Sequence, residues 1–182
     1  MNGENSLSSV PPLPSEYRAS GVLLHVTSLP SPYGIGDVGP AAFAWVDRLC
    51  DAGQSWWQAL PLGPTGYANS PYQALSSFAG NWLLISPDGL IEDGLLRASD
   101  CEGYSFAADS VDYQAVARFK YGLLETAWNN FSRGARADLR PDYERFCNSQ
   151  AHWLDDYALF RALKAKYNGD CYLDWPAELV QV

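Results

Sequence analysis

The chain has 182 residues, enough to bury the core of one ordinary domain. Aromatic residues make up 14% and charged residues 18%, a composition that excludes an intrinsically disordered chain. Twelve Lys and Arg against 21 Asp and Glu give a net charge of −9, which repels phosphate backbones, and no run of basic residues offsets it. We therefore expect no nucleic-acid partner, whereas a neutral substrate such as a sugar is compatible with this charge.

Residues 1–20 are rich in Ser and Pro, lack an apolar run of signal-peptide length, and are predicted to be a flexible leader. No stretch approaches the roughly 18 to 20 apolar residues of a membrane helix, so we expect no membrane association. The four cysteines are widely spaced and show no metal-ligand spacing: Cys50, Cys101, Cys147 and Cys171. Reduced, mostly buried thiols in a cytoplasmic protein are favoured over a secreted disulfide framework.

The first organised element is a predicted buried strand from Gly21 to Thr27, a continuous apolar run rich in β-forming residues. His25 lies inside this run. A histidine in an apolar strand is more often a hydrogen-bonded core residue than a ligand. Because His25 is close to the carboxyl end of the strand, where α/β proteins collect functional groups, a functional role stays open.

A glycine loop follows this strand, with the pattern G-x-G-x-x-G at Gly34, Gly36 and Gly39. In a dinucleotide-binding fold the first glycine follows the strand directly, and an acidic residue ends the second strand. Here six residues, two of them proline, separate the strand from the first glycine, and the next strand ends without an acidic residue. Nucleotide binding is therefore the least favoured function, and Asp37 is predicted to cap or brace the loop.

A helix is predicted from Ala41 to Ala52, followed by a second strand from Trp56 to Leu60. The helix carries apolar residues at three-to-four spacing, which predict one buried stripe: Phe43, Val46, Leu49 and Cys50. Strand, helix and strand over residues 21–60 form a parallel βαβ unit, which is the opening of an α/β fold.

A loop over residues 61–80 then presents tyrosines beside hydroxyl and amide groups. Prolines and glycines alternate at its start, which predicts a turn with a defined backbone conformation and not a flexible loop. Tyr67, Ser70 and Tyr72 would offer ring faces and a hydroxyl, a combination that suits a sugar ring. The alternative is a surface turn with packed tyrosines.

The second half of the chain is predicted to be mainly helical. A turn at Pro87–Gly89 precedes a short helical segment at Ile91–Leu96, and long helices cover Tyr113–Phe131 and Pro141–Tyr167. The residues expected to face inward are Val116, Phe119, Leu123, Leu124, Trp128 and Phe131, then Phe146, Trp153, Leu154, Tyr157, Phe160 and Leu163. Two parallel strands do not make a stable sheet, so we expect the front part of a larger fold.

Spacing alone identifies no catalytic constellation. Asp155 and Asp156 are neighbours that project about 100° apart on a helix, so they cannot flank one bond and are predicted to lie on a solvated face. Ser70 lacks the G-x-S-x-G context of a nucleophile, and His152 has no evident nucleophile as a partner.

Three blocks resemble the 4-alpha-glucanotransferase family, also called amylomaltase or disproportionating enzyme: Gly21–Pro40, Trp57–Gln73 with its continuation to Asn81, and Trp153–Phe160. The resemblance spans about residues 18 to 180, in the family's order. It implies an α/β fold that is the N-terminal part of a (β/α)8 TIM barrel, with the first two strands and an incomplete barrel. Residues 21–96 would start the barrel and include substrate-binding loop 61–80, and residues 97–182 would be a mainly helical insertion subdomain.

The resemblance also implies an activity. The family transfers a segment of 1,4-alpha-D-glucan to an acceptor sugar with retention, using an Asp nucleophile and a Glu acid/base and no metal or organic cofactor. The expected partners are therefore maltooligosaccharides and alpha-1,4-glucans. The catalytic carboxylates would come after Val182, so we expect the isolated chain to be inactive. The alternative is a non-catalytic alpha-glucan-binding or interaction module.

Few site residues carry over from the family. Ser70 and Tyr72 match positions that line the donor-side sugar site, and Tyr67 matches a tyrosine of a second glucan-binding groove. Asn69 stands where the family commonly has Asp, so it receives no role.

Overall fold

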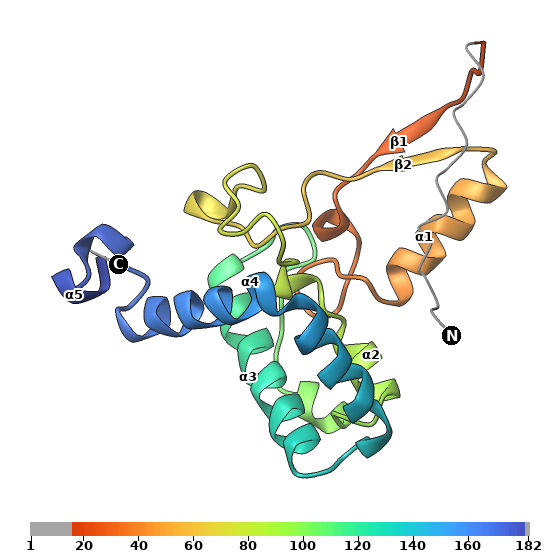
Figure 1. The fold of residues 1–182 in the computed structure, drawn as a ribbon. Coiled ribbons are helices and arrows are strands. Elements are labelled where there is room, and N and C mark those ends of the chain that lie inside the picture. The colour runs from red at the N-terminus through yellow and green to blue at the C-terminus, as the bar shows by residue number, and fades with distance from the viewer. Residues whose placement is uncertain (1–15, 181–182) are drawn as a thin grey trace, which may run out of the picture.

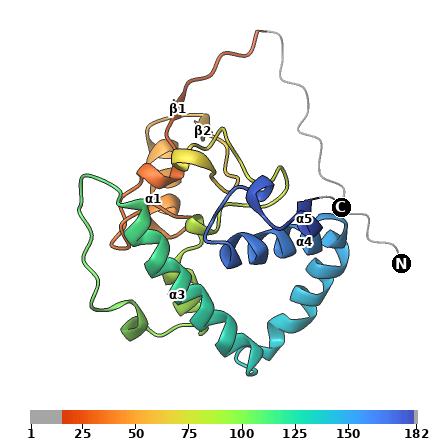
Figure 2. The same ribbon diagram turned by 90° about the vertical axis from the view of Figure 1, so that its left-hand side faces the viewer.

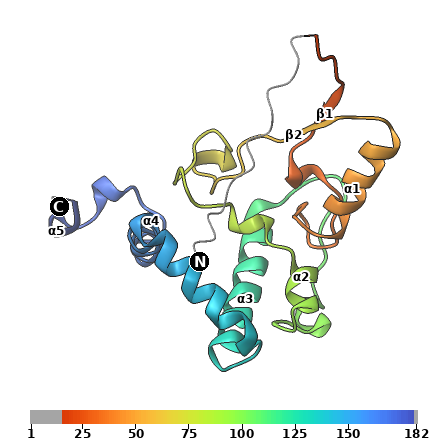
Figure 3. The same cartoon turned by 45° about the vertical axis from the view of Figure 1, so that its right-hand side comes forward.

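The computed structural model describes residues 16–180, so most of the predicted leader, residues 1–15, lies outside the described residues. The strands and α-helices are β1 (Gly21–Leu23), α1 (Pro40–Asp51), β2 (Trp56–Gln58), α2 (Pro87–Glu92), α3 (Tyr113–Ser132), α4 (Arg140–Lys166) and α5 (Ala177–Val180). Short 3-10 turns occur between them. The β1–α1–β2 unit lies on one side, α3 passes through the middle, and α4 and α5 lie on the other side (Figures 1 and 3).

The parallel βαβ unit is confirmed, because β1 pairs with β2 in parallel and Gly21 lies opposite Trp56. Both strands have three residues and are shorter than predicted. The ladder ends because a 3-10 turn, Val26–Ser28, follows β1. His25 is thus outside the strand, where its ring nitrogen Nδ1 accepts a hydrogen bond from the backbone N–H of Thr27 at 3.3 Å and caps this turn.

Helix α1 begins at Pro40, whose fixed φ suits the first turn. It buries Ala42 and Leu49, whereas Phe43 and Val46 are exposed and Cys50 is also exposed. The prediction of one buried stripe on this helix is therefore wrong, except that Leu49 is buried as predicted. The short two-stranded sheet covers only one side of the helix, and the buried cluster there joins Ala42 to three residues of the neighbouring segments: Val26, Leu29 and Leu84.

Helix α2 begins at Pro87, so the predicted turn at Pro87–Gly89 is wrong, and the predicted short helix at Ile91–Leu96 overlaps α2 only at Ile91 and Glu92. The hydroxyl of Ser86 accepts a hydrogen bond from the backbone N–H of Gly89 at 3.5 Å and caps the helix. A capping serine followed by proline is a helix start, and here it outweighs the turn tendency of the Pro-Asp-Gly sequence.

Helix α3 is the central element, and its predicted bounds are confirmed to within a residue at each end. The carboxylate of Asp112 caps it by accepting hydrogen bonds from two backbone N–H groups at 3.0 Å. The helix buries Val116, Phe119, Lys120, Leu123, Ala127 and Phe131. Of the residues predicted to face inward, Trp128 is instead half exposed and Leu124 is only partly buried.

Helix α4 also has the predicted extent, but it buries none of its residues. The prediction of a buried face on this helix is therefore wrong: Phe146 is exposed, and Trp153, Leu154, Tyr157, Phe160 and Leu163 are only partly buried. Figure 2 shows the reason, because α3 and α4 diverge from their connection and the second half of α4 turns back toward the other elements. Across the part of the chain that the structure describes, none of the helices combines the length and apolar character that a bilayer crossing needs.

Candidate functional site

The predicted substrate-binding loop, residues 61–80, is tied at its base by backbone hydrogen bonds. The N–H of Asn81 donates to the carbonyl of Leu62 at 2.8 Å, and the N–H of Leu75 donates to the carbonyl of Pro64 at 2.9 Å. Pro64 is itself buried. The two ends of the loop are thus held to each other, and the loop projects above the second half of α4 in Figure 1.

The tip of the loop has a defined, compact conformation. Ala68 and Asn69 both adopt left-handed backbone conformations, with φ of 53° and 57°. The N–H of Ser70 donates to the carbonyl of Tyr67 at 3.1 Å, which closes the turn. A Cβ at Gly66 would overlap the backbone carbonyl oxygen of Gln73, so this close approach requires glycine.

The tip presents the predicted tyrosines to solvent. Tyr67 is 83% exposed and Tyr72 is 72% exposed, so neither ring packs into the core. Ser70 is partly buried, and its Oγ accepts a hydrogen bond from the N–H of Tyr72 at 3.3 Å. The serine hydroxyl therefore holds the turn and still has its own proton to donate. The exposed rings of Tyr67 and Tyr72 stand on either side of this serine in the sequence.

A cavity of about 810 Å³, the loop cavity, lies beside the tip. Its lining includes Tyr67 and Asn69 of the loop, Trp82, Tyr113, and Arg161 and Lys164 of α4. Ser70 and Tyr72 are not among the lining residues, so the structure brings only Tyr67 of the three predicted site residues to this cavity. Among the residues that the structure describes, the lining has aromatic rings and two cations but no carboxylate, and such a surface can bind a polyhydroxy chain without cleaving it.

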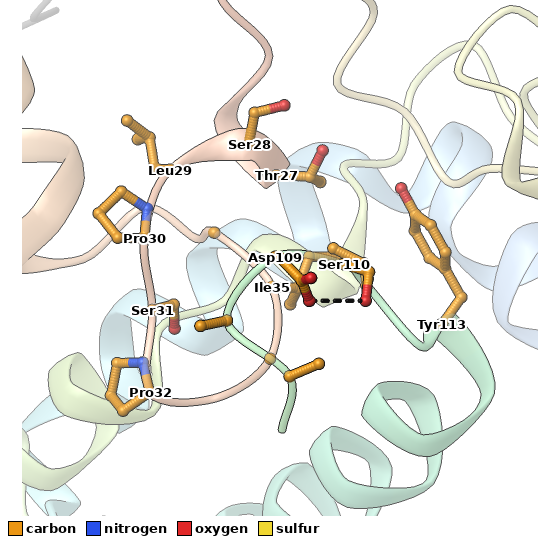
Figure 4. A pocket seen from close by; sticks show the side chains of 15 residues that line it. Thr27, Ser28, Leu29, Pro30, Ser31, Pro32, Ile35, Asp109, Ser110 and Tyr113 are labelled. Atoms are coloured by element: carbon orange, nitrogen blue, oxygen red, sulfur yellow. Dashed lines mark hydrogen bonds between the residues drawn. The ribbon is translucent and has the colours of Figure 1, made fainter. Parts of the chain in front are cut away.

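A second cavity, of about 700 Å³, lies between the segment after β1 and residues 107–113 (Figure 4). In Figure 4 the side chains of Thr27 and Tyr113 border the same space from opposite segments. Asp109, the one carboxylate that lines it within residues 16–180, accepts a hydrogen bond from the hydroxyl of Ser110 at 3.2 Å. A retaining glycoside transfer needs two carboxylates, so this cavity alone cannot carry it out.

The glycine loop serves packing. The N–H of Gly36 donates to the carbonyl of Thr27 at 3.1 Å, and the N–H of Val38 donates to the carbonyl of Leu84 at 2.9 Å. A Cβ at Gly36 would overlap the carbonyl oxygen of Val26. These two amides are therefore committed to internal bonds and are not free to bind a phosphate group.

Asp37 braces this loop through a partner that the sequence did not reveal. The Nζ of Lys120 donates to the Oδ2 of Asp37 at 3.0 Å and to the carbonyls of Leu83 at 2.7 Å and Ile85 at 2.9 Å. Burial raises the pKa of Asp37 and lowers the pKa of Lys120, and the attraction within the pair opposes both shifts. Lys120 follows Val116 by one helical turn on the apolar stripe of α3, which is the signal that could have marked it as buried.

Of the remaining candidates, Cys171 lines the loop cavity, and the other cysteines, Asp155 and Asp156 line neither cavity. All four cysteines are free, but Cys50 and Cys171 are exposed and the other two only partly buried, so the expectation of mostly buried thiols is wrong. Burial raises the pKa of the Cys101 thiol. Asp155 and Asp156 are exposed on α4, as predicted for a solvated face. Within residues 16–180 no group of three His, Cys, Asp or Glu could hold a metal ion.

Comparison with known proteins decides the family. Residues 24–182 match the family model described as 4-alpha-glucanotransferase. The chain belongs to this family. Among its relatives, the 4-alpha-glucanotransferase of Synechocystis sp. is 44% identical over 163 residues, which cover 89% of this chain and 32% of the relative. That of Thermus thermophilus is also 44% identical, over 162 residues, with the same coverage of 89% and 32%.

The likeness extends to structure. The amylomaltase from Streptococcus agalactiae in complex with acarbose superposes with a TM-score of 0.81 at 38% identity, covering 87% of this chain and 32% of that chain. The chain thus spans about a third of the length of the relatives it matches, in line with the expected N-terminal portion. Its short parallel sheet and its helices are consistent with part of the amylomaltase fold.

Proposed function

We propose that this chain forms the N-terminal part of a 4-alpha-glucanotransferase and supplies the loop that binds the glucan. Its two strands would be the first two of a (β/α)8 barrel, and residues 97–182 would be the helical insertion. Family membership supports this assignment, as does the parallel β1–α1–β2 unit. The substrates would be maltooligosaccharides and other alpha-1,4-glucans, and the acarbose bound by the solved amylomaltase is in keeping with that class.

The observation that carries the proposal is the fixed, exposed tip of loop 61–80. A sugar ring stacks its C–H face on an aromatic ring while its hydroxyls form hydrogen bonds. Tyr72 and Ser70 offer these two contacts on a tied turn, and Tyr67 offers another ring at the loop cavity. A tied turn loses little conformational entropy on binding, which favours affinity.

In this proposal the bond-breaking groups come from outside these 182 residues. An Asp would attack the anomeric carbon while a Glu protonates the leaving oxygen, and the same Glu would then deprotonate the acceptor hydroxyl. The present residues would bind and orient the donor chain. Orientation of this kind contributes substantially to catalysis, because it converts an encounter between molecules into a reaction within one complex.

A chimaera tests the proposal. The 182 residues would be fused to the remaining two thirds of the Thermus thermophilus relative, and disproportionation of maltotriose would be measured. We expect the chimaera to be active, and we expect Ser70→Ala and Tyr72→Ala to lower kcat/KM by about tenfold each. Tyr17→Ala, a partly exposed tyrosine in the segment before β1, is the matched control. An inactive chimaera, or equal activity in all four proteins, would overturn the proposal.

The second candidate is a non-catalytic glucan-binding module, favoured because none of the residues 16–180 that line the loop cavity is a carboxylate. The two candidates predict different results for the same proteins. Binding of maltotriose by the 182-residue chain, together with an inactive chimaera, would favour the module. Binding together with an active chimaera would favour the transferase, and turnover by the 182-residue chain alone would contradict both.

A further inference from the structure

A cleft of about 480 Å³, the helix groove, lies between α3 and α4. Its lining includes Trp82, Tyr121, Glu125, Trp128, Tyr157 and Arg161. Gly80, the last residue of the loop that the family resemblance marked as substrate-binding, also lines the groove, whereas the six side chains named above lie outside that loop. The groove exists because the two helices diverge and α4 buries no residue against its neighbours (Figure 2).

The helix groove continues from the loop cavity, because Trp82 and Arg161 line both. Along α3, Tyr113 lines the loop cavity, and Tyr121 and Trp128 line the groove. At a rise of 1.5 Å per residue, these two side chains lie roughly 12 Å and 22 Å further along the helix than Tyr113. A linear ligand seated at Tyr67 could therefore extend along α3 for several sugar units.

The chemistry of the groove suits a sugar chain. Tyr121 is 61% exposed and Trp128 is 50% exposed, so both offer ring surface to a ligand. Glu125 and Arg161 lie among these rings, and within residues 16–180 neither forms an ion pair. Ring faces for C–H groups, together with an uncommitted acceptor and an uncommitted donor for hydroxyls, match a neutral polyhydroxy chain better than a purely apolar ligand.

We propose that the helix groove binds the distal part of an alpha-1,4-glucan whose proximal units occupy the loop cavity, which makes this chain selective for longer maltooligosaccharides. This inference rests on the proposed glucan function and deepens it. The groove would act as an extension site: it adds affinity for long chains and contributes nothing to the binding of short ones. Tyr121 would supply a stacking surface, and Glu125 and Arg161 would bind hydroxyls on its flanks.

Isothermal titration of the 182-residue chain with maltotriose and with maltoheptaose tests this length dependence. We expect maltoheptaose to bind more tightly, and we expect Tyr121→Ala to weaken it by about tenfold without changing maltotriose affinity. Tyr121→Phe keeps the ring and should retain most of the preference. Because Tyr121 is mostly exposed, these variants should fold like the unmodified chain, which their circular dichroism spectra would check. Tyr17→Ala is again the control.

The outcomes separate this inference from the proposed function. Failure to bind either sugar would argue against the glucan function itself, and with it the groove. Maltotriose binding without a gain for maltoheptaose, or a gain that survives Tyr121→Ala, would overturn the groove alone. The same variant in the chimaera should lower kcat/KM for maltoheptaose and leave that for maltotriose unchanged. If it changes neither, the remaining polypeptide covers the groove and the proposal is wrong.

Discussion

Replacing Lys120 with Met should strongly destabilise the fold, because the substitution leaves the Asp37 carboxylate buried without its cation. Lys120 is 2% exposed, and its ammonium group donates to Asp37 and to two backbone carbonyls. Removing one partner of a buried ion pair costs about 3–5 kcal/mol. Methionine keeps the unbranched stem, so little of this cost comes from an empty cavity. Urea denaturation at pH 7, followed by tryptophan fluorescence, measures the loss.

The pH dependence of the loss identifies its cause. Burial holds the pKa of Asp37 above its ordinary value of 3.8 even beside Lys120, and without the cation this pKa rises further. Between the unfolded pKa and the higher folded pKa, the folded variant binds the extra proton. Its stability therefore falls as the pH rises through that window. We expect the difference from the unmodified chain to be smaller near pH 4 than at pH 7.

Two further variants complete this experiment. Asp37→Asn combined with Lys120→Met removes the buried charge, so the stability of this double variant should no longer fall as the pH rises through the window where Asp37 titrates. Arg118→Met changes an exposed arginine on the same helix and should stay within about 0.5 kcal/mol of the unmodified chain. A loss in Lys120→Met that is below about 1 kcal/mol, or the same at both pH values, would refute the assignment of a desolvated pair.

Three other predictions follow from the packing. The isolated chain should melt broadly and bind a hydrophobic dye, since apolar residues such as Phe43 are exposed; a sharp, dye-silent melt of a monomer in calorimetry would contradict this. Asn81→Ala removes the side-chain cap of the 3-10 turn after the loop and should cost about 1 kcal/mol in urea denaturation; an unchanged midpoint would refute that role. Iodoacetamide should label Cys50 and Cys171 faster than Cys101, whose pKa is raised by burial. Peptide mass spectrometry measures the order of labelling, and faster labelling of Cys101 would contradict this expectation.

The long helices and the βαβ unit could be predicted because their signals are local. Apolar spacing and a capping Asp112 mark α3, and a proline marks the start of α1. Strand length could not be predicted, since a ladder extends only as far as its partner follows it, and here the chain turns at His25. The start of α2 was predictable from Ser86 and Pro87, but the following Asp-Gly favoured a turn.

Of the candidate site, only the loop could be predicted from the sequence. Proline, glycine and tyrosine in one short segment indicated a shaped, exposed turn, and the exposure of Tyr67 and Tyr72 agrees with that interpretation. The cavity beside it could not be predicted, because Arg161 on α4 reaches it from far along the sequence. The ion pair was hidden for the same reason: Asp37 and Lys120 are separated by 83 positions. Local patterns carry no information about such distant contacts.

The buried ion pair and loop 61–80 are mechanically connected. Lys120 binds the carbonyls of Leu83 and Ile85, and the same stretch of chain begins at Asn81, whose N–H holds the base of the loop at Leu62. Movement of the loop base would therefore strain hydrogen bonds around a buried charge, which is costly. The loop base is thus connected through residues 81–85 to the buried ammonium group of Lys120, while the tip is held by its own turn. Under the proposed function, a glucan would meet a surface that needs little rearrangement to bind it, which is the condition for orienting a donor bond toward the catalytic carboxylates.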